Sequence, residues 1–360
     1  MKPTAFTGRL GVRHPLVLAP MAGGPSTPAL CAAVSEAGGL GSYGAAYLAP
    51  EKLRDEIRAI RAATSRPFAI NLFADDGVAA DEATLTAARE ALARFRAELG
   101  LPPAGPRAAL PDVAIPPLAP LAEVLLEERV PVFSFTFGIP PRKMLDACRK
   151  AGIATMGTAT TVAEAKALEQ AGVDFVCAQG AEAGGHHGTF DRDAEPPLIG
   201  TLALVPQVVD AVRLPVIAAG GIMDGRGFAA ALALGAGAVS LGTAFLRCPE
   251  AGTSAPYRAA LRQARDDATV ITRAFSGRAA RGLSNRFTRE MSSAPIAPYP
   301  IQNALTREIR ATAAKLGDPG FLSLWAGQAA PLAREMPARE LVAQIVHEAE
   351  AVISGLRAEP

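Results

Sequence analysis

The glycine-rich segment AQGAEAGGHHGTF carries the residue best suited to chemistry, His186. An imidazole exchanges a proton near neutral pH, and the surrounding glycines let a ligand approach the side chain. We therefore predict that His186 is catalytic or contacts the substrate, taking a proton from a weak carbon acid. The other histidines are His14, His187 and His347. We expect His187 to point away from His186 along an extended loop, and His14 and His347 to be structural.

Two glycine turns follow short apolar runs late in the chain. Gly220 and Gly221 end the first run, in VIAAGGIMDGRG, and Gly242 ends the second, in GAVSLGTAFL. Glycine lets the backbone approach a ligand closely, and free N–H groups at the start of a helix attract anions. We therefore predict a phosphorylated ligand at these turns. The chain contains neither G-x-x-x-x-G-K-[ST] nor a G-x-G-x-x-G after a strand, so nucleoside triphosphate and Rossmann-type binding are not supported.

Three further polar residues stand at predicted strand ends. The carboxamides of Asn71 and Gln179 can donate and accept hydrogen bonds at once, which suits the edge of a planar heterocycle; capping a backbone group is the alternative. Glu182 is a candidate second acid, although a salt bridge is the favoured interpretation. No paired carboxylates and no nucleophile elbow occur, which disfavours glycosidase and serine hydrolase chemistry.

The elements that must position these residues are short apolar runs alternating with helical patterns. The helical patterns include Thr27–Ala37, Glu51–Thr64, Thr161–Gln170 and Phe228–Leu234. The predicted strands are Pro15–Ala19, Gly39–Tyr43, Pro67–Leu72, Pro131–Phe135, Ile153–Met156, Asp174–Ala178, Pro215–Ala219 and Ala238–Leu241. Eight successive βα units predict an α/β fold, a closed (β/α)8 TIM barrel. The polar and glycine-rich points above all fall on its carboxyl rim, and the two glycine turns follow strands seven and eight, the usual phosphate site of such barrels.

The remaining segments do not fit the βα repeat. Residues 75–116 contain an extra helical stretch and a proline-rich run too long for an ordinary loop. We predict that they form, with residues 251–330, a smaller and mainly helical lobe over the active-site rim. The barrel is then built from residues 1–74 and 117–250. Residues 331–360 are predicted to form a C-terminal helix that packs on the barrel.

Composition excludes several classes of protein. Lys and Arg total 36 against 35 for Asp and Glu, so neither a nucleic acid nor a membrane surface is an expected partner. The N-terminal segment lacks the apolar core of a signal peptide, and the four cysteines form no C-x-x-C pair. We therefore expect reduced cysteines, no metal site and a cytoplasmic location. Whether the chain forms a homo-oligomer is left open.

Several motifs together resemble the nitronate monooxygenases, once called 2-nitropropane dioxygenases, over nearly the whole chain. The motifs are LAPMAGGPSTPALCAAVSEAGGLGSYGAAYL, AINLF, AQGAEAGGHHGTF and VIAAGGIMDGRGFAAALALGAGAVSLGTAFL, and PYPIQNALT with LWAGQ resembles the class I enzymes. The resemblance implies FMN as cofactor and His186 as the catalytic residue. It also implies that Tyr299, in PYP, closes the substrate pocket. The implied cofactor-binding residues are Met21, Ala22, Asn71, Gln179, Gly180, Gly184, Gly220, Gly221, Ser240, Leu241, Gly242 and Thr243.

The activity that the resemblance implies is oxidative denitrification. An alkyl nitronate of the propionate 3-nitronate type would react with dioxygen to give an aldehyde or ketoacid and nitrite. No nicotinamide would be needed, because the flavin carries the difficult step. His186 would stabilise the anion or deprotonate the neutral nitro compound.

Two other functions remain as alternatives. The first is an NAD(P)H-dependent FMN reductase on the same barrel, either an enoyl-acyl-carrier-protein reductase or a quinone reductase, because these enzymes share similar glycine-rich segments. The second is a non-catalytic FMN-binding barrel. IMP dehydrogenase is a more distant barrel relative that needs a cysteine after strand six, whereas Cys177 lies within that predicted strand.

Overall fold

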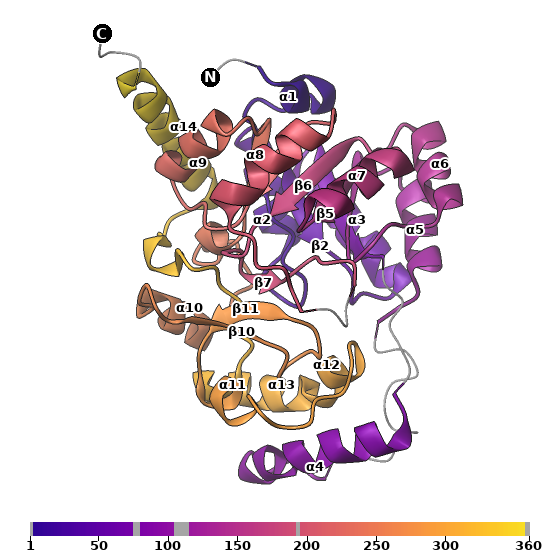
Figure 1. Ribbon diagram of the computed structural model, residues 1–360, viewed down its shortest axis with the longest axis vertical. Helices are drawn as coiled ribbons and strands as arrows, with labels where there is room; N and C mark the ends of the chain where they lie inside the picture. Colours follow the sequence, from indigo (N-terminus) through magenta and orange to yellow (C-terminus); the bar gives the residue numbers. More distant parts are fainter. Residues whose placement is uncertain (1–2, 75–79, 104–114, 192–194, 357–360) are drawn as a thin grey trace.

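Eight parallel strands form the barrel, as predicted (Figure 1). The computed structural model describes residues 3–74, 80–103, 115–191 and 195–356. Neighbours in the sheet follow the order β1-β9-β8-β6-β5-β4-β3-β2, and the parallel bridge between Val17 and Leu40 joins the two end strands. The strands are β1 (Leu16–Leu18), β2 (Gly41–Gly44), β3 (Phe68–Phe73), β4 (Val132–Thr136), β5 (Ala154–Ala159), β6 (Phe175–Gln179), β8 (Val216–Ala219) and β9 (Ala238–Leu241).

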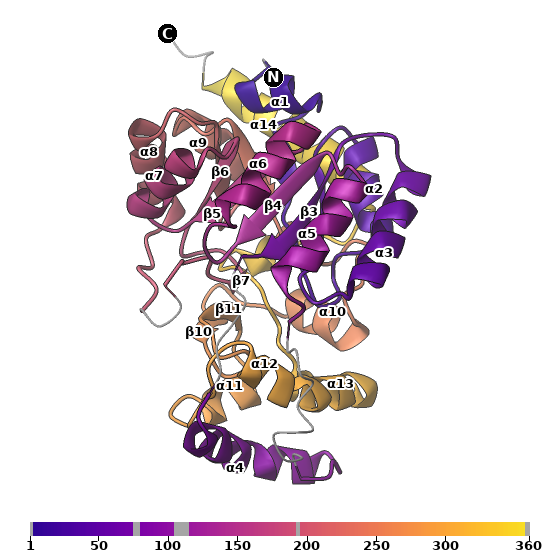
Figure 2. The same ribbon diagram turned by 90° about the vertical axis from the view of Figure 1, so that its right-hand side faces the viewer.

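Helices surround the strands, and several begin or end at residues that suit helix termini. Thr27 and Thr161 accept hydrogen bonds from the first turns of α2 and α7, while Gly152 and Gly172 end α6 and α7 in the left-handed conformation. The C-terminal helix α14 packs against α9 and α2 (Figure 2). The surrounding helices are α2 (Pro28–Glu36), α3 (Pro50–Ala63), α5 (Leu118–Glu127), α6 (Arg142–Ala151), α7 (Val162–Ala171), α8 (Thr201–Ala211), α9 (Gly225–Ala233) and α14 (Ala338–Gly355).

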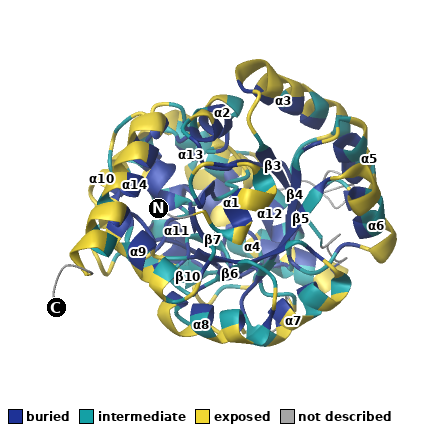
Figure 3. Ribbon diagram, turned by 90° about the horizontal axis from the view of Figure 1, so that it is seen from above, coloured by how far each residue is buried: buried dark blue, intermediate teal, exposed yellow. Residues whose placement is uncertain are grey.

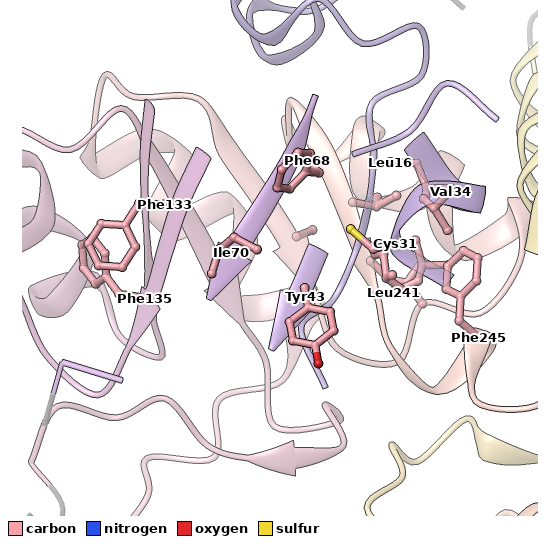
Figure 4. Packing of buried hydrophobic residues seen from close by; sticks show 14 of the residues in the cluster. Leu16, Cys31, Val34, Tyr43, Phe68, Ile70, Phe133, Phe135, Leu241 and Phe245 are labelled. Carbon is pink, nitrogen blue, oxygen red and sulfur yellow. The ribbon is translucent and has the colours of Figure 1, made fainter. Parts of the chain in front are cut away.

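The barrel has two layers of apolar packing. The outer layer lies between strands and helices and includes Cys31, Val34 and Phe245 (Figure 4). The inner layer fills the amino end of the barrel and is closed by α1 (Ala5–Leu10), which Figure 3 shows within the ring of helices. Phe6 of α1 is fully buried against Phe175, with ring centroids 5.4 Å apart. Because this end is filled, only the carboxyl end of the barrel is left to hold a ligand.

The elements outside the barrel form a lobe with its own apolar core, below the carboxyl ends of the strands in Figures 1 and 2. The ring of Phe95 in α4 packs at an angle against those of Phe287 and Phe321, with centroids 4.9 and 5.9 Å away, which joins a helix from early in the chain to later elements. The lobe's elements are α4 (Glu82–Glu98), α10 (Ala255–Arg262), β10 (Thr269–Thr272), β11 (Ala280–Leu283), α11 (Arg286–Glu290), α12 (Ile301–Leu305) and α13 (Arg307–Leu316). The expected domain boundary between residues 74 and 75 falls at the edge of a described range. Most of the proline-rich run lies outside the described residues.

The lobe also contains a small antiparallel sheet that the sequence patterns did not predict. Its order is β10-β11-β7, and β7 (Gly185–His186) belongs to the loop that follows barrel strand β6. Ala280 pairs with His186, and Arg281 pairs with Gly185. The predicted catalytic histidine is therefore held where the barrel and the lobe meet. Among the described residues, no helix is both long and apolar enough to cross a bilayer.

Candidate active site

A cavity of about 510 Å³ opens at the carboxyl ends of the strands and is bounded by both the barrel and the lobe. Its walls combine glycine-rich backbone, a few amide and hydroxyl groups, and aromatic rings, which is typical of a cofactor or substrate site. The structure brings together here the following predicted residues: Met21, Ala22, Asn71, Gln179, Gly184, His186, Gly220, Gly221, Ser240, Gly242 and Thr243.

Three predicted residues lie behind this lining. Leu241 is buried in the outer core, because strand residues alternate in direction and its neighbour Ser240 faces the cavity. A Cβ on Gly180 would lie 2.1 Å from the Thr201 hydroxyl oxygen, so this glycine allows α8 to pack closely. Tyr299 is fully buried, and its ring centroid lies 5.8 Å from that of His186.

The hydrogen bonds of Ser276 define which nitrogen of His186 carries the proton. The His186 Nε2 lies 2.9 Å from the Ser276 hydroxyl oxygen. That hydroxyl donates its single proton to the carbonyl oxygen of Arg278 at 3.0 Å, so toward His186 it can only accept. A neutral ring with its proton on Nε2 satisfies both contacts of the Ser276 hydroxyl and leaves the basic lone pair on Nδ1.

Burial sets the protonation state of His186. Burial first, and then the positive charges of Arg278 and Arg310 and the neighbouring His187, lower the pKa of His186 to about 3. The ring is therefore neutral at pH 7. This differs from the sequence-based expectation of an imidazole that titrates near neutral pH. The sequence around His186 does not show that the folded chain buries its ring and brings two guanidinium groups close to it.

Gln179 holds the loop that carries His186. Its Nε2 donates to the carbonyl oxygen of His186 at 3.0 Å, and its Oε1 accepts from the amide of Gly188 at 2.7 Å. Because a carboxamide has a further donor and a further acceptor position, Gln179 can fix this loop and still face the cavity. Gln179 therefore makes the contacts with backbone groups that were given above as its alternative role.

Replacing Gln179 with Glu should loosen the loop. An oxygen would replace Nε2 and face the His186 carbonyl oxygen, so one hydrogen bond is lost and two acceptors meet. We expect the free energy of unfolding to fall by about 1–3 kcal/mol, and the amide of Gly188 to exchange with solvent faster. Denaturant titration measures the free energy of unfolding, and hydrogen exchange measures the protection of the Gly188 amide. The exposed Gln207→Glu, which loses a similar bond to a backbone oxygen, should change neither by a comparable amount.

Glu182 is neither an active-site acid nor half of an ion pair in the described part of the chain. Its carboxylate accepts hydrogen bonds from the Thr201 amide at 2.8 and 3.0 Å and from the Thr201 hydroxyl at 2.8 Å. It therefore caps the amino end of α8, where a negative charge is stabilised. Glu164 of α7 similarly binds the loop further along the chain, where its carboxylate accepts a hydrogen bond from the amide of Phe190 at 2.7 Å. The two carboxylates fix the loop on either side of His186.

His187 is a buried structural residue. Its side chain is 3% exposed, and Nε2 has no hydrogen-bond partner among the described residues. Burial first, and then the Arg281 charge, lower the pKa of His187 to about 4. Its ring is therefore neutral at pH 7, and protonating it would place an unpaired charge inside the protein.

Stability should consequently fall in mild acid. The folded-state pKa of His187 lies below the value of 6.5 for the unfolded chain, so the stabilising contribution is present above pH 6.5 and is lost as the pH falls toward 4. From pH 7 to pH 5 this one residue should account for about 2 kcal/mol of the loss in unfolding free energy. Denaturant titration of His187→Phe at pH 7 and pH 5 should show that the fall in unfolding free energy between the two pH values is smaller by that amount. His347→Gln, at an exposed site on α14, should retain it.

The lobe supplies cavity residues that sequence reasoning missed. These are Asn303, Arg307, Arg310 and Trp325. Trp325 lies with its ring centroid 5.6 Å from that of His186. Asn303 and Trp325 belong to the motifs PYPIQNALT and LWAGQ, so the motifs were a signal for them. No comparable signal marked Arg310.

The two glycine turns lie side by side, because β8 and β9 are neighbours in the sheet. Both turns line the cavity. The amide groups of Gly221 and Gly242 donate to no acceptor among the described residues. Adjacent free N–H groups are suited to a phosphate or another anion.

Comparison with known proteins identifies the family. The family model described as nitronate monooxygenase matches residues 4–348. The chain belongs to the nitronate monooxygenase family. A nitronate monooxygenase from Pseudomonas aeruginosa strain PAO1 is 46% identical over 95% of this chain and 98% of its own length. A probable nitronate monooxygenase from Staphylococcus aureus strain Newman is 41% identical over 95% of this chain and 96% of its own. The chain is thus an oxidoreductase of the nitronate monooxygenase family, as its motifs implied.

Solved structures support the same assignment. A nitroalkane oxidase from Streptomyces ansochromogenes has a TM-score of 0.89 and 42% identity, covering 98% of this chain and all of that one. FabK from Thermotoga maritima is less similar, with a TM-score of 0.77 and 32% identity over 99% of both chains. The chain therefore shares its fold with both solved structures and is more similar in sequence and structure to the nitroalkane oxidase.

Proposed function

We propose that the protein is an FMN-dependent nitronate monooxygenase that converts alkyl nitronates of the propionate 3-nitronate type, with dioxygen, into an aldehyde or ketoacid and nitrite. The observation that carries this proposal is the neutral His186 in a cavity that also contains two adjacent glycine turns. Family membership supplies the reaction class, and the cavity supplies sites for a phosphorylated cofactor and a small anion.

The residues of the cavity fit FMN. The free amides of Gly221 and Gly242 are suited to its phosphate, together with the side chains of Ser240 and Thr243 at the same turns. Gly242 has no side chain, so its backbone is the surface that it presents to the cavity. Backbone at Ala22, Gly184 and Gly220 completes the walls.

The amides of Asn71 and Gln179 are suited to the polar edge of the flavin ring, and Met21 offers an apolar surface beside it. The chemistry that FMN supplies when bound is acceptance of an electron from the nitronate and its transfer onward to dioxygen. Asn71 is held for this role by a hydrogen bond from its Nδ2 to the Ser134 hydroxyl, at 3.1 Å.

His186 and its neighbours position the substrate. The Ser276 hydroxyl fixes the Nε2–H form, so Nδ1 remains the basic atom that takes a proton from a neutral nitro compound. A nitronate arrives already deprotonated and does not need this step. Phe137 and Tyr299 lie edge-on to the His186 ring, with centroids 5.8 Å away in each case. Phe137 lines the cavity and the Tyr299 ring backs it from the lobe, so the two rings limit the access of water to the imidazole.

One experiment tests cofactor and activity together. The purified protein should show flavin absorbance, release FMN on denaturation, and produce nitrite when propionate 3-nitronate is added under air. A colourless protein that cannot be reconstituted with FMN, or a flavoprotein that releases no nitrite, would overturn the proposal.

The similarity to FabK makes an NAD(P)H-dependent flavin reductase the second candidate. In the absence of oxygen, the flavin of such an enzyme would lose its absorbance rapidly on addition of NADH or NADPH. We expect the nicotinamides to have little effect here and a nitronate to reduce the flavin. Rapid bleaching by a nicotinamide would favour the reductase instead.

A further inference from the structure

Arg310 is a cation in the cavity wall with unused hydrogen-bonding capacity. Its Nη2 donates to the carbonyl oxygen and to Oδ1 of Asn303, each at 2.8 Å. Its Nε is shielded from solvent and has no hydrogen-bond partner, and no carboxylate pairs with the guanidinium in the described part of the chain. By contrast, Arg96 of α4, a buried arginine of the lobe, pairs with Glu308 at 2.6 Å and donates to a carbonyl oxygen through Nε.

The charge of Arg310 is retained despite this environment. Burial, followed by the nearby positive charge of Arg307, lowers the pKa of Arg310 to about 10, so the side chain is still protonated at pH 7. The groups that face it are the hydroxyl of Tyr47, the amide of Asn303, Arg307 and the neutral ring of His186. None of these is an anion. An enclosed cation that lacks a protein anion is costly, and the cost is offset when a ligand supplies the negative charge.

We propose that Arg310 recognises a carboxylate on the substrate, at the end away from the nitronate, and so makes short carboxylated nitronates preferred over neutral alkyl nitronates. This inference rests on the proposed function. Arginine and carboxylate form charge-assisted hydrogen bonds, and a substrate without the carboxylate leaves the guanidinium enclosed and unpaired. Asn303 keeps the guanidinium in place through its two contacts with Nη2.

Two nitronates separate recognition of the carboxylate from the oxidation itself. Propionate 3-nitronate carries the carboxylate and propyl-1-nitronate does not. We expect the unmodified enzyme to have the higher kcat/KM for propionate 3-nitronate. In Arg310→Met this value should fall by a factor of about 100, as when one partner of an enclosed charge pair is removed. The value for propyl-1-nitronate should change less than about threefold.

Two further variants test charge and geometry. Arg310→Lys should lie between the unmodified enzyme and Arg310→Met, because an ammonium retains the charge but not the planar contacts with Asn303. Lys315→Met removes the same charge from an exposed position on the same helix, α13, and should leave both nitronates unaffected. The FMN content and the denaturation midpoint of Arg310→Met, compared with those of the unmodified enzyme, show whether this variant is folded.

Binding of succinate gives a test that does not require turnover. Succinate has the length of propionate 3-nitronate and carries a carboxylate at each end. Calorimetry should show that Arg310→Met weakens succinate binding at least tenfold relative to the unmodified holoenzyme, and that Lys315→Met does not. Equal losses on both nitronates, no preference in the unmodified enzyme, or unchanged succinate binding would each overturn the inference. If the unmodified enzyme oxidises neither nitronate, the proposed function fails, and succinate binding still decides whether Arg310 holds a carboxylate.

Discussion

Replacing His186 with Asn should lower kcat/KM for a neutral nitroalkane by a factor of about 10², the lower end of the usual contribution of a general base, because an imidazole whose pKa is lowered to about 3 is a weak base. Oxidation of the corresponding nitronate should fall much less. The neutral compound must lose a proton from carbon, and the basic Nδ1 is absent in the variant. Asn places its carboxamide near the position of Nδ1 and does not reach the Ser276 hydroxyl, so the contact made by Nε2 is lost as well. Nitrite release from the two substrates, assayed side by side, measures the difference.

The pH profile adds a second observable. Because burial and two guanidinium groups lower the pKa of His186 to about 3, the base is fully deprotonated from pH 5 to pH 8. No ionisation of an enzyme base should therefore appear in that range in kcat/KM for the nitroalkane. Ser276→Ala is a useful companion, because it keeps the imidazole but removes the group that fixes its proton on Nε2.

His347→Asn is the matched control, since it removes an exposed imidazole from α14. An equal loss on nitroalkane and nitronate in His186→Asn would show that this residue binds both forms rather than removing a proton. A clear inflection near pH 6.5 that disappears in His186→Asn would show that the ring is hydrated in the working enzyme.

The barrel could be predicted because each strand is a short apolar run bounded by turn residues. For example, Ala238–Leu241 was predicted as a strand with the same limits that β9 has. The small sheet could not be predicted in this way. Its strand β7 is only Gly185–His186, and its side-chain pattern carries no strand signal. That segment becomes extended because Ala280 and Arg281 of β11 pair with it, which is a tertiary effect.

The barrel half of the cavity was predictable for a similar reason, since strand ends fall on one rim. The lobe half was predictable only in part. Asn303 and Trp325 lie within motifs, whereas Arg310 is separated from His186 by more than a hundred positions and lies within none of them. The state of His186 also escaped prediction. Its residue type favours titration near neutral pH, whereas its pKa depends on burial and on the charges of Arg278 and Arg310, which only the folded chain brings close to it.

Replacing Gly184 with Ala should cost the protein its cofactor. A Cβ there would lie 2.5 Å from the carbonyl carbon of Ala326 and 2.5 Å from the amide nitrogen of Gly327. Both neighbours are backbone, so the chain itself must move. The Gly327 amide donates to the Thr243 hydroxyl at 3.0 Å, which links this segment to the turn after β9. Displacing it therefore disturbs the loop of His186 and the expected phosphate site together.

We expect Gly184→Ala to lower the free energy of unfolding by about 1–3 kcal/mol, the usual cost of overpacking. The ratio of FMN to protein in the purified variant should fall at least tenfold under dilute conditions, because the amides of the turns no longer converge. Absorbance of the purified protein gives this ratio, and denaturant titration gives the stability.

Gly185→Ala is the matched control at the adjacent position. A Cβ at Gly185 meets nothing within 4 Å, although its φ of +77° makes Ala strained there. This variant should lose about 1–2 kcal/mol of stability from the backbone alone, yet retain its flavin. If both variants lose flavin equally, backbone strain in β7 controls binding. If neither does, the contact between Gly184 and residues 326–327 is not what shapes the site. Loss confined to Gly184→Ala would show that the lobe holds the flavin site closed through this one close approach of two backbones.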